Sequence, residues 1–310
     1  MGKRAFLFPG QGTQYIGMGM DFYDNFPYCR DIFEMAEEAA GVDIRKICSG
    51  QEDLLNQTKY TQISILAVEL CVMKTAEQEF GITACASAGL SLGEYAAAVY
   101  SGAISMEDAL RIVSKRGLYM QEACSNGGMA AIVGLDAGII EDVCAGETGV
   151  VSIANYNSPA QIVISGEKDA VIKAAEKCKN AGALKTVVLN VSGPFHSVLM
   201  EPAGKRLKTD LEKIATGDIL VPYVSNVTAD YVKDQDMVKG LLEEQITHSV
   251  LWEQSMKKLL ENQQIEEFLE IGPGKTLRGF ARQIDRKAKV TCIGQVNDLL
   301  KYKGGISLHM

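Results

Sequence analysis

Residues 89–93, Gly-Leu-Ser-Leu-Gly, constrain the fold of this chain more than any other stretch of its sequence. They end a small, apolar segment, 82–90, that is expected to be a strand, and they precede residues 94–100, which are expected to form a helix. Glycines let the backbone turn sharply from strand to helix, and the turn lifts the serine hydroxyl out of the sheet. In this setting the pattern G-x-S-x-G is typical of an α/β sheet with a nucleophilic serine, here Ser91, whereas a chance match would be only a glycine-rich turn.

Strand and helix signals alternate on both sides of this turn. Strands are expected at 5–8, 219–227 and 267–271, and helices at 62–80, around 207–214, within 237–262 and after 272–274. Such alternation favours a parallel sheet with helices on both faces.

The middle of the chain has a different order. A strand, a helix, two strands, a helix and a strand are expected at 129–133, 137–144, 150–154, 161–164, 169–181 and 184–191. The order β-α-β-β-α-β is that of a ferredoxin-like unit. A length of 310 residues is enough for two domains. The sequence therefore predicts an α/β fold with a hydrolase-like parallel-sheet core, residues 1–125 and 193–310, and an inserted ferredoxin-like subdomain, residues 126–192.

The charge balance limits the partners of the chain. It has 31 Lys+Arg and 39 Asp+Glu, a net charge of −8 and a pI near 5.1. We therefore expect neither nucleic acid nor an anionic membrane as a partner. The sequence has no run of 18 apolar residues for a membrane span, and the apolar run at 5–8 is too short for a secretion signal.

The cysteines indicate the compartment. There are eight, and none of their spacings approaches the C-x-x-C of a zinc or redox site. Scattered, unpaired cysteines are typical of a reducing cytoplasm, so we expect free thiols and no metal site.

Only three histidines are present to activate a serine: His196, His248 and His309. His309 is next to the last residue, and His248 lies in helical surroundings where a surface histidine is expected. His196 follows the last strand of the insert, at a strand end of the kind where active sites of α/β folds lie, so it is the expected base. No carboxylate between Ser91 and His196 stands out as the third member of a triad, which leaves either an unrecognised acid or a neutral group to orient the ring.

Several motifs, in this order, give the chain a resemblance to a known family. They are Phe8-Pro9-Gly10-Gln11-Gly12, residues 89–94, Lys115-Arg116-Gly117, Asn155-Tyr156-Asn157-Ser158-Pro159, residues 193–197, Ser225-Asn226-Val227-Thr228 and Glu270-Ile271-Gly272-Pro273-Gly274-Lys275. With them the sequence resembles, nearly from end to end, the malonyl-CoA:acyl carrier protein transacylases of bacterial type II fatty acid synthesis and the related acyltransferase domains of polyketide synthases. The fold of that family, a hydrolase-like core with a ferredoxin-like subdomain, agrees with the pattern above.

The resemblance implies a transfer in two steps. Ser91 would attack the thioester of malonyl-CoA while His196 takes its proton, and the malonyl-serine ester would pass its acyl group to the phosphopantetheine thiol of acyl carrier protein. The main-chain carbonyl of Gln245 would orient His196, and the backbone amides of Gln11 and Leu92 would form the oxyanion hole. Malonyl-CoA and acyl carrier protein are the implied partners, and the chain itself would need no cofactor.

By the same resemblance, Arg116 would bind the free carboxylate of malonate. A guanidinium suits this role because it can make two parallel hydrogen bonds to a carboxylate. Spacing alone would favour an arginine on the solvated face of a helix. Phe195 fits a preference for malonyl over methylmalonyl groups. Asn157 is a substrate-side candidate that could instead belong to an Asn-Ser-Pro turn.

Two departures from the family pattern and several alternatives remain. The family often has histidine in place of Leu90 and commonly Asn-Pro in place of His248-Ser249, so we expect local differences beside Ser91 and in the loop after Gln245. An acyl-thioester hydrolase, a polyketide-associated acyltransferase or an inactive docking protein for carrier proteins would share this scaffold. We expect a monomer, and the candidates for docking an acidic carrier protein are Lys185, Lys205, Arg206 and Lys208.

Overall fold

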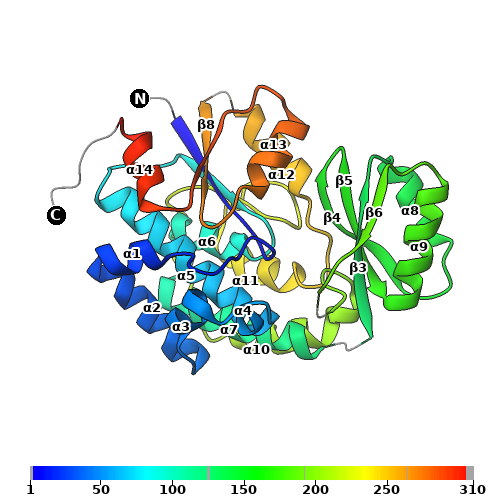
Figure 1. Cartoon of the computed structure of the whole chain (residues 1–310), viewed down its shortest axis with the longest axis horizontal. Helices are drawn as coiled ribbons and strands as arrows, with labels where there is room; N and C mark the ends of the chain where they lie inside the picture. Colours follow the sequence, from blue (N-terminus) through cyan, green and yellow to red (C-terminus); the bar gives the residue numbers. More distant parts are fainter. Residues whose placement is uncertain (1–2, 124–125, 192, 263, 305–310) are drawn as a thin grey trace.

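The computed structural model describes residues 3–123, 126–191, 193–262 and 264–304. Its larger part is built on a parallel sheet in the order β7-β2-β1-β8-β9 (Figure 1). The strands are β1 (Lys3–Phe8), β2 (Ala86–Gly89), β7 (Tyr223–Val224), β8 (Ile265–Ile271) and β9 (Val290–Ile293). This confirms the predicted α/β class with a parallel-sheet core.

Helices cover both faces of this sheet. They are α1 (Met20–Asn25), α2 (Pro27–Ala40), α3 (Ile44–Gly50), α4 (Glu52–Leu55), α5 (Thr58–Gln78), α6 (Gly93–Ser101), α7 (Met106–Glu122), α10 (Glu201–Leu211), α11 (Gln235–Glu244), α12 (Trp252–Glu261), α13 (Thr276–Ile284) and α14 (Val296–Tyr302), with a 3-10 turn at Val198–Met200. None of the helices in the described ranges is both long and apolar enough to cross a membrane.

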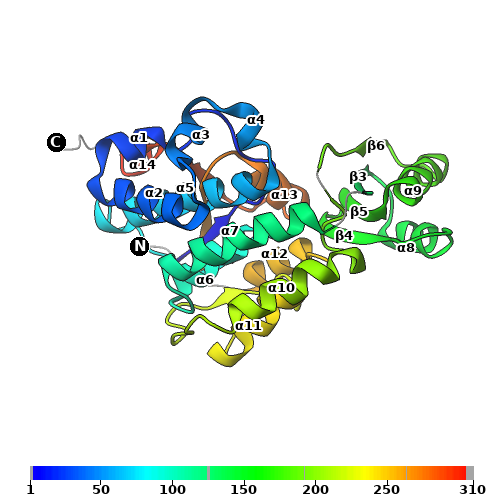
Figure 2. The same cartoon turned by 90° about the horizontal axis from the view of Figure 1, so that it is seen from below.

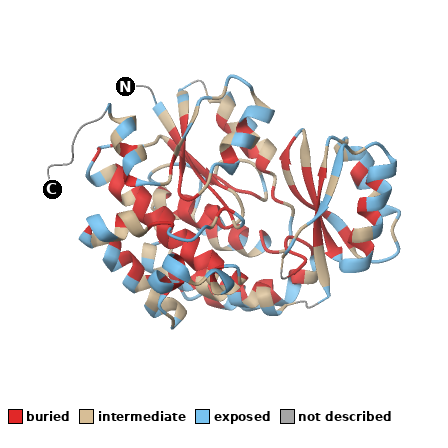
Figure 3. Cartoon of the chain, in the orientation of Figure 1, coloured by how far each residue is buried: buried red, intermediate tan, exposed pale blue. Residues whose placement is uncertain are grey.

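The central strand of this sheet, β1, explains why two helical layers are needed. All of its last four residues are fully buried, and their side chains alternate between two apolar clusters. Phe6 and Phe8 pack with α5 and its neighbours, whereas Ala5 and Leu7 pack with Trp252 of α12. A strand that is apolar on both faces must be covered on both faces. Figure 3 shows the resulting buried centre around the sheet and α5.

The middle of the chain forms a second, antiparallel sheet in the order β4-β5-β3-β6. Its elements are β3 (Gly127–Val133), α8 (Ala137–Ala145), β4 (Val151–Ser158), β5 (Gln161–Glu167), α9 (Lys168–Asn180) and β6 (Lys185–Val188). Ile132 and Ile164 pack under α8 and α9, whereas Met129 and Val163 face the main core. The order of elements is the predicted β-α-β-β-α-β. Residues 125 and 192, at the expected edges of this unit, lie outside the described residues.

A short segment after α11 fastens the small sheet to the core. Val250 forms a parallel bridge with Asn155 of β4, donates its N–H to the carbonyl of Ala154 (2.8 Å) and accepts the N–H of Tyr156 (3.0 Å). The hydroxyl of Ser249 donates to the carbonyl of Ile153 (2.5 Å). Figure 2 shows α7 and α10 lying side by side, with one end of each toward the small sheet.

Some predicted boundaries are wrong. The strand expected at 219–227 is only the two residues of β7, because Pro222 has no N–H to donate and Asn226 turns into the active site. The strand expected at 82–90 begins only at Ala86. Strand β4 runs through Ser158, where a turn was expected, and it takes up the change of direction in bulges.

Candidate active site

Ser91 lies at the turn between β2 and α6, as its motif predicts. The backbone there has a positive φ of 53°, a conformation that residues other than glycine rarely adopt. Both glycines are required by close contacts, because a Cβ on Gly89 would lie 1.9 Å from the carbonyl carbon of Gly93, and a Cβ on Gly93 would lie 2.2 Å from the carbonyl oxygen of Phe8. The glycines thus let β1, β2 and α6 meet under the serine.

His196 reaches the serine from the segment that follows the small sheet. Its Nε2 lies 2.8 Å from Ser91 Oγ, and its Nδ1 lies 2.8 Å from the main-chain carbonyl oxygen of Gln245. A carbonyl only accepts hydrogen bonds, so Nδ1 carries the proton and Nε2 is free to accept the proton of the serine. The ring is therefore oriented by a neutral group, which answers the question that the sequence left open.

The surroundings of His196 keep it neutral. Burial lowers the pKa of the imidazole, the positive charge of Arg116 lowers it further, and the result is a pKa of about 4. A neutral imidazole is the form that can act as a base at physiological pH.

Arg116 is buried beside this pair rather than on a solvated face of α7. It is 1% exposed, and its Nη2 donates to Ser91 Oγ at 3.1 Å and to Gln245 Oε1 at 2.9 Å. Its Nη1 donates to Gln62 Oε1 at 2.6 Å, and its Nε has no hydrogen-bond partner among the described residues. No carboxylate of those residues lies within ion-pair distance of it. The buried Glu94 acts on it only at a distance, with the Gln245 amide between them. A buried guanidinium without a carboxylate in direct contact is costly unless an anion joins it.

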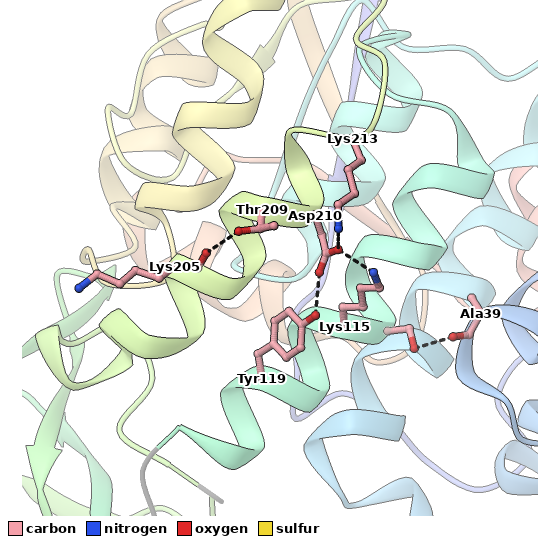
Figure 4. A network of polar contacts seen from close by, with 8 residues as sticks. Ala39, Lys115, Tyr119, Lys205, Thr209, Asp210 and Lys213 are labelled. Carbon is pink, nitrogen blue, oxygen red and sulfur yellow. Dashed lines mark hydrogen bonds and ion pairs between the residues drawn. The ribbon is translucent and has the colours of Figure 1, made fainter.

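Helix α7 is held in place next to Arg116 by Asp210 of α10 (Figure 4). The Asp210 carboxylate accepts hydrogen bonds from Lys115 Nζ (2.7 Å), Tyr119 Oη (2.7 Å) and Lys213 Nζ (3.0 Å). Burial acts to raise the pKa of Asp210, but these donors outweigh it and lower the pKa to about 2. The carboxylate is therefore charged, and its bond to Lys115 joins α10 to α7 at the residue next to Arg116.

Gln62 is a site residue that sequence reasoning missed. It is 1% exposed on α5, and besides accepting from Arg116 it donates from Nε2 toward Gln11 Oε1 (3.4 Å). The Gln11 side chain in turn donates to Thr58 Oγ1 (3.1 Å). The only sequence signal for Gln62 was an amide among the apolar residues of a helix that is buried nearly all round.

Asn226 and Glu94 form a second layer under the serine and were also missed as site residues. Asn226 Oδ1 accepts the N–H of Ser91 (2.6 Å), and its Nδ2 donates to the carbonyl of Gly89 (2.7 Å). Glu94 Oε2 accepts from Gln245 Nε2 (2.6 Å) and from the N–H of Asn226 (3.2 Å). Burial raises the pKa of Glu94 to about 7, although these hydrogen bonds act in the opposite direction.

The backbone amides of Gln11 and Leu92, which the resemblance assigns to an oxyanion hole, both lie near Ser91 at the end of the sheet. Gln11 follows β1, and Leu92 is the N-cap residue of α6, so both lie at the carboxyl ends of the central strands. Neither N–H has an acceptor in the described part of the chain. A free amide can stabilise a developing negative charge, and the Leu92 amide has the added field of the α6 N-terminus.

Comparison with known proteins assigns the family. A model of the acyl transferase domain matches residues 5–295. Over 299 residues the chain is 41% identical to the malonyl CoA-acyl carrier protein transacylase of Bacillus subtilis strain 168, covering 94% of both chains. The chain belongs to the malonyl CoA-acyl carrier protein transacylase family. It is also 39% identical to the transacylase of Escherichia coli K12, covering 92% of this chain and 93% of that one.

Solved structures of transacylases agree in fold. The MCAT of Streptococcus pneumoniae has a TM-score of 0.92 and 42% identity, covering 98% of this chain and 100% of that one. A malonyl-transacylase in complex with a type II PKS acyl-carrier protein has a TM-score of 0.92 and 35% identity, covering 96% of this chain and 98% of that one.

The site of this transacylase opens into a cavity of about 280 Å³. Ser91, His196, Gln11, Asn157 and Phe195 line it, and the rest of the lining is mainly apolar. Asn157 lies within β4 rather than in a turn, and it donates to Gln161 Oε1 (2.9 Å). Its own Oδ1 is buried and has no partner among the described residues, so it can accept a hydrogen bond from a ligand in the cavity.

The departures from the family pattern have local consequences. Leu90 lines the cavity and adds an apolar wall where the family often has histidine. The His248 side chain is exposed, and its Nδ1 lies near Thr247 Oγ1 (3.1 Å) and the carbonyl oxygen of Glu244 (2.8 Å), which agrees with a surface histidine. His309 lies outside the described residues. No group of three or more His, Cys, Asp or Glu side chains within the described ranges could hold a metal ion.

The cations suggested for docking an acidic partner are mostly paired already. Lys205 lies 2.6 Å from Glu201, Arg206 2.8 Å from Glu122, and Lys208 3.0 Å from Glu243. Lys185 alone of the four has no acidic partner in the part of the chain that the structure describes. Three of the four suggested residues therefore contribute little net positive charge to the surface of this transacylase.

Proposed function

We propose that this chain transfers a malonyl group from malonyl-CoA to the phosphopantetheine thiol of acyl carrier protein through a malonyl-serine intermediate. The observation that carries the proposal is the buried guanidinium of Arg116, 3.1 Å from Ser91 Oγ and without a carboxylate partner among the described residues. An acyl group that ends in a carboxylate would neutralise this cation, and malonate has that carboxylate whereas acetate does not.

In the first half-reaction Ser91 Oγ bonds to the thioester carbon while its proton passes to His196 Nε2. The N–H groups of Gln11 and Leu92 stabilise the negative oxygen of the tetrahedral intermediate. When the carbon–sulfur bond breaks, the proton on His196 passes to the leaving thiolate of CoA. The malonyl group is then held as an ester of Ser91, with its carboxylate at Arg116.

The second half-reaction reverses these roles. The phosphopantetheine thiol gives its proton to His196 as its sulfur bonds to the ester carbon. The bond from that carbon to Ser91 Oγ then breaks, and the serine regains the proton. Every group in this route comes from one chain or from a substrate, so a monomer without a cofactor or metal suffices. The free cysteines are in keeping with a reducing cytoplasm.

Intact mass spectrometry tests the proposal. The chain is incubated with malonyl-CoA, holo acyl carrier protein is then added, and both proteins are weighed. We expect a malonyl adduct on the enzyme that moves to the carrier and is absent from Ser91→Ala. Free malonate without transfer would point instead to a thioester hydrolase, and an enzyme with no adduct would contradict the proposal. Carriers from fatty acid and from polyketide synthesis, compared by kcat/KM, distinguish the two pathways.

A further inference from the structure

One stretch of this acidic chain is strongly basic. Residues 275–289, here called the basic segment, contain six Lys and Arg residues and one Asp, a net charge of +5. The chain as a whole carries −8, so the other residues carry −13. The cations are Lys275, Arg278, Arg282, Arg286, Lys287 and Lys289.

These six cations have no ion-pair partner among the described residues, although Asp298 lines the same hollow as Lys275 and Arg278. None of them lies within ion-pair distance of a carboxylate in the described ranges, in contrast to the paired Lys205, Arg206 and Lys208. The Glu270 carboxylate, which reaches the first turn of this helix, accepts instead the backbone N–H groups of Leu277 (2.9 Å) and Arg278 (3.0 Å). Glu270 therefore caps α13 and leaves the charged side chains free.

The basic segment also borders the catalytic cavity. Thr276, Leu277 and Phe280 of α13 line the catalytic cavity, while Lys275 and Arg278 line a second hollow of about 480 Å³. A helix is ~10 Å wide, so a protein seated over α13 would touch the cations and the cavity opening together. Figure 1 shows α13 on the side of the core that is turned toward the small sheet.

The helix is a firm platform for such a contact. Glu270 fixes its first turn, Leu277 and Ala281 are buried in the core, and Gln283 near its end accepts a hydrogen bond from Ser158 of β4 (2.5 Å). Arg278 and Arg282, the two cations on this helix, therefore give charge complementarity with little ordering cost on binding.

We propose that the basic segment docks the acidic carrier protein whose phosphopantetheine arm enters the catalytic cavity. This inference rests on the proposed function, because it assigns a surface to the second substrate of that reaction. The rest of the chain, at −13, would repel a partner that is itself acidic, so attraction has to be local. The interaction should weaken as salt rises, because these charges are exposed.

The test compares Arg278→Glu/Arg282→Glu with a matched control. Lys173→Glu/Lys179→Glu changes the net charge by the same amount on exposed positions of α9. We measure the transfer of malonyl from enzyme to carrier and, separately, the formation of malonyl-serine from malonyl-CoA and from malonyl-pantetheine. At 50 mM salt we expect kcat/KM for the carrier to fall about tenfold or more in the α13 variant, mainly through KM, and to change less than twofold in the control. The difference should shrink at 500 mM salt, and both acylation rates should stay within twofold.

Other outcomes would overturn the inference. Equal losses in both variants would show that only net charge matters. A loss of acylation by malonyl-CoA but not by malonyl-pantetheine, with carrier transfer unchanged, would assign the surface to the CoA phosphates. Unchanged kinetics in a variant with normal circular dichroism would show that the carrier docks elsewhere. Failure of the proposed function is distinct, since the unmodified chain would then form no malonyl-serine.

Discussion

The imidazole of His196 is held by the carbonyl oxygen of Gln245 rather than by a carboxylate. A carbonyl fixes the tautomer and the direction of the ring as a carboxylate would, but it adds no negative charge that would stabilise the imidazolium. The nearby charge is instead the cation of Arg116. The base is therefore weak in the free enzyme, and a bound carboxylate would remove that handicap by neutralising Arg116.

This environment predicts an unusual pH profile. Burial and Arg116 lower the pKa of His196 to about 4, and the neutral ring is the active form. On the acid side of the pH profile, kcat/KM for malonyl-CoA should therefore stay constant down to about pH 5.5. The half-maximal point should lie near pH 4. Because kcat/KM reports the free enzyme, rapid-mixing acylation rates between pH 3.5 and 8 measure it. Glu94→Gln, which removes the other buried group that titrates nearby, should leave this limb in place, and a midpoint near 6.5 would contradict the prediction.

Arg116 should decide which acyl group is accepted. Arg116→Met removes the cation while keeping an unbranched side chain, and we expect kcat/KM for malonyl-CoA to fall about a hundredfold, since charge-assisted hydrogen bonds to a carboxylate are lost. The rate of acylation of Ser91 by acetyl-CoA, corrected for hydrolysis of the acyl-enzyme, should change less than tenfold. Arg116→Lys keeps the charge but cannot make the two parallel hydrogen bonds. Its kcat/KM for malonyl-CoA should therefore lie between those of Arg116→Met and the unmodified chain. An unchanged ratio of malonyl to acetyl rates would refute the role of Arg116.

At the scale of elements, the sequence predicted what depends on local pattern. The strand–turn–helix around Ser91 and the ferredoxin-like order both follow from residues close together in the chain. The strand expected at 184–191 is only Lys185–Val188, so His196 lies in the segment after the small sheet and not directly at a strand end. Asn226 and Gln62 could not be found in this way, because they meet Ser91 and Arg116 only after distant elements pack. The two-residue strand β7 was over-predicted for the same reason, since the Asn226 side chain, and not the strand pattern, decides how that segment ends.

The contact between α7 and α10 gives a prediction for stability. Asp210→Asn keeps the shape of the side chain but weakens three charged or polar hydrogen bonds, so we expect a loss of about 1–3 kcal/mol in the free energy of unfolding at pH 7. The pKa of Asp210 is lowered in the folded chain, to about 2, so its contribution is complete above pH ~5 and is lost as the pH falls through 2. Thermal unfolding of both proteins at several pH values measures this. Asp218→Asn, at an exposed position, is the control. If the difference in unfolding free energy between Asp210→Asn and the unmodified chain persisted at pH 2, this explanation would be wrong.

At the scale of the whole molecule, one segment links the catalytic base to the position of the small sheet. Gln245 orients His196 at the end of α11, and Val250, five residues later, pairs with β4. Asn157, which lines the cavity from β4, therefore lies on the same connected backbone as the group that aims the base. A shift of the small sheet should reach both the substrate side and the catalytic side of the site.

Val250→Pro tests this link. Proline has no N–H, so the hydrogen bond to the carbonyl of Ala154 is lost and the small sheet is released at that point. We expect kcat to fall several-fold more than in Val250→Ala, which keeps the backbone bond but loses a similar apolar contact. Hydrogen exchange of β4 amides should speed up in the proline variant. Equal kcat values in the two variants would show that the segment does not position the base.

The two residues that exchange a proton, Ser91 and His196, both have left-handed backbones, with φ of 53° and 58°. A Cβ there costs about 1–2 kcal/mol, which glycine avoids. Ser91→Gly should therefore melt at a higher temperature than the equally inactive Ser91→Ala, and calorimetry of the pair would show it. Selection for thermal stability alone would therefore enrich inactive variants, because stability favours glycine at these two positions whereas catalysis needs the serine and histidine side chains.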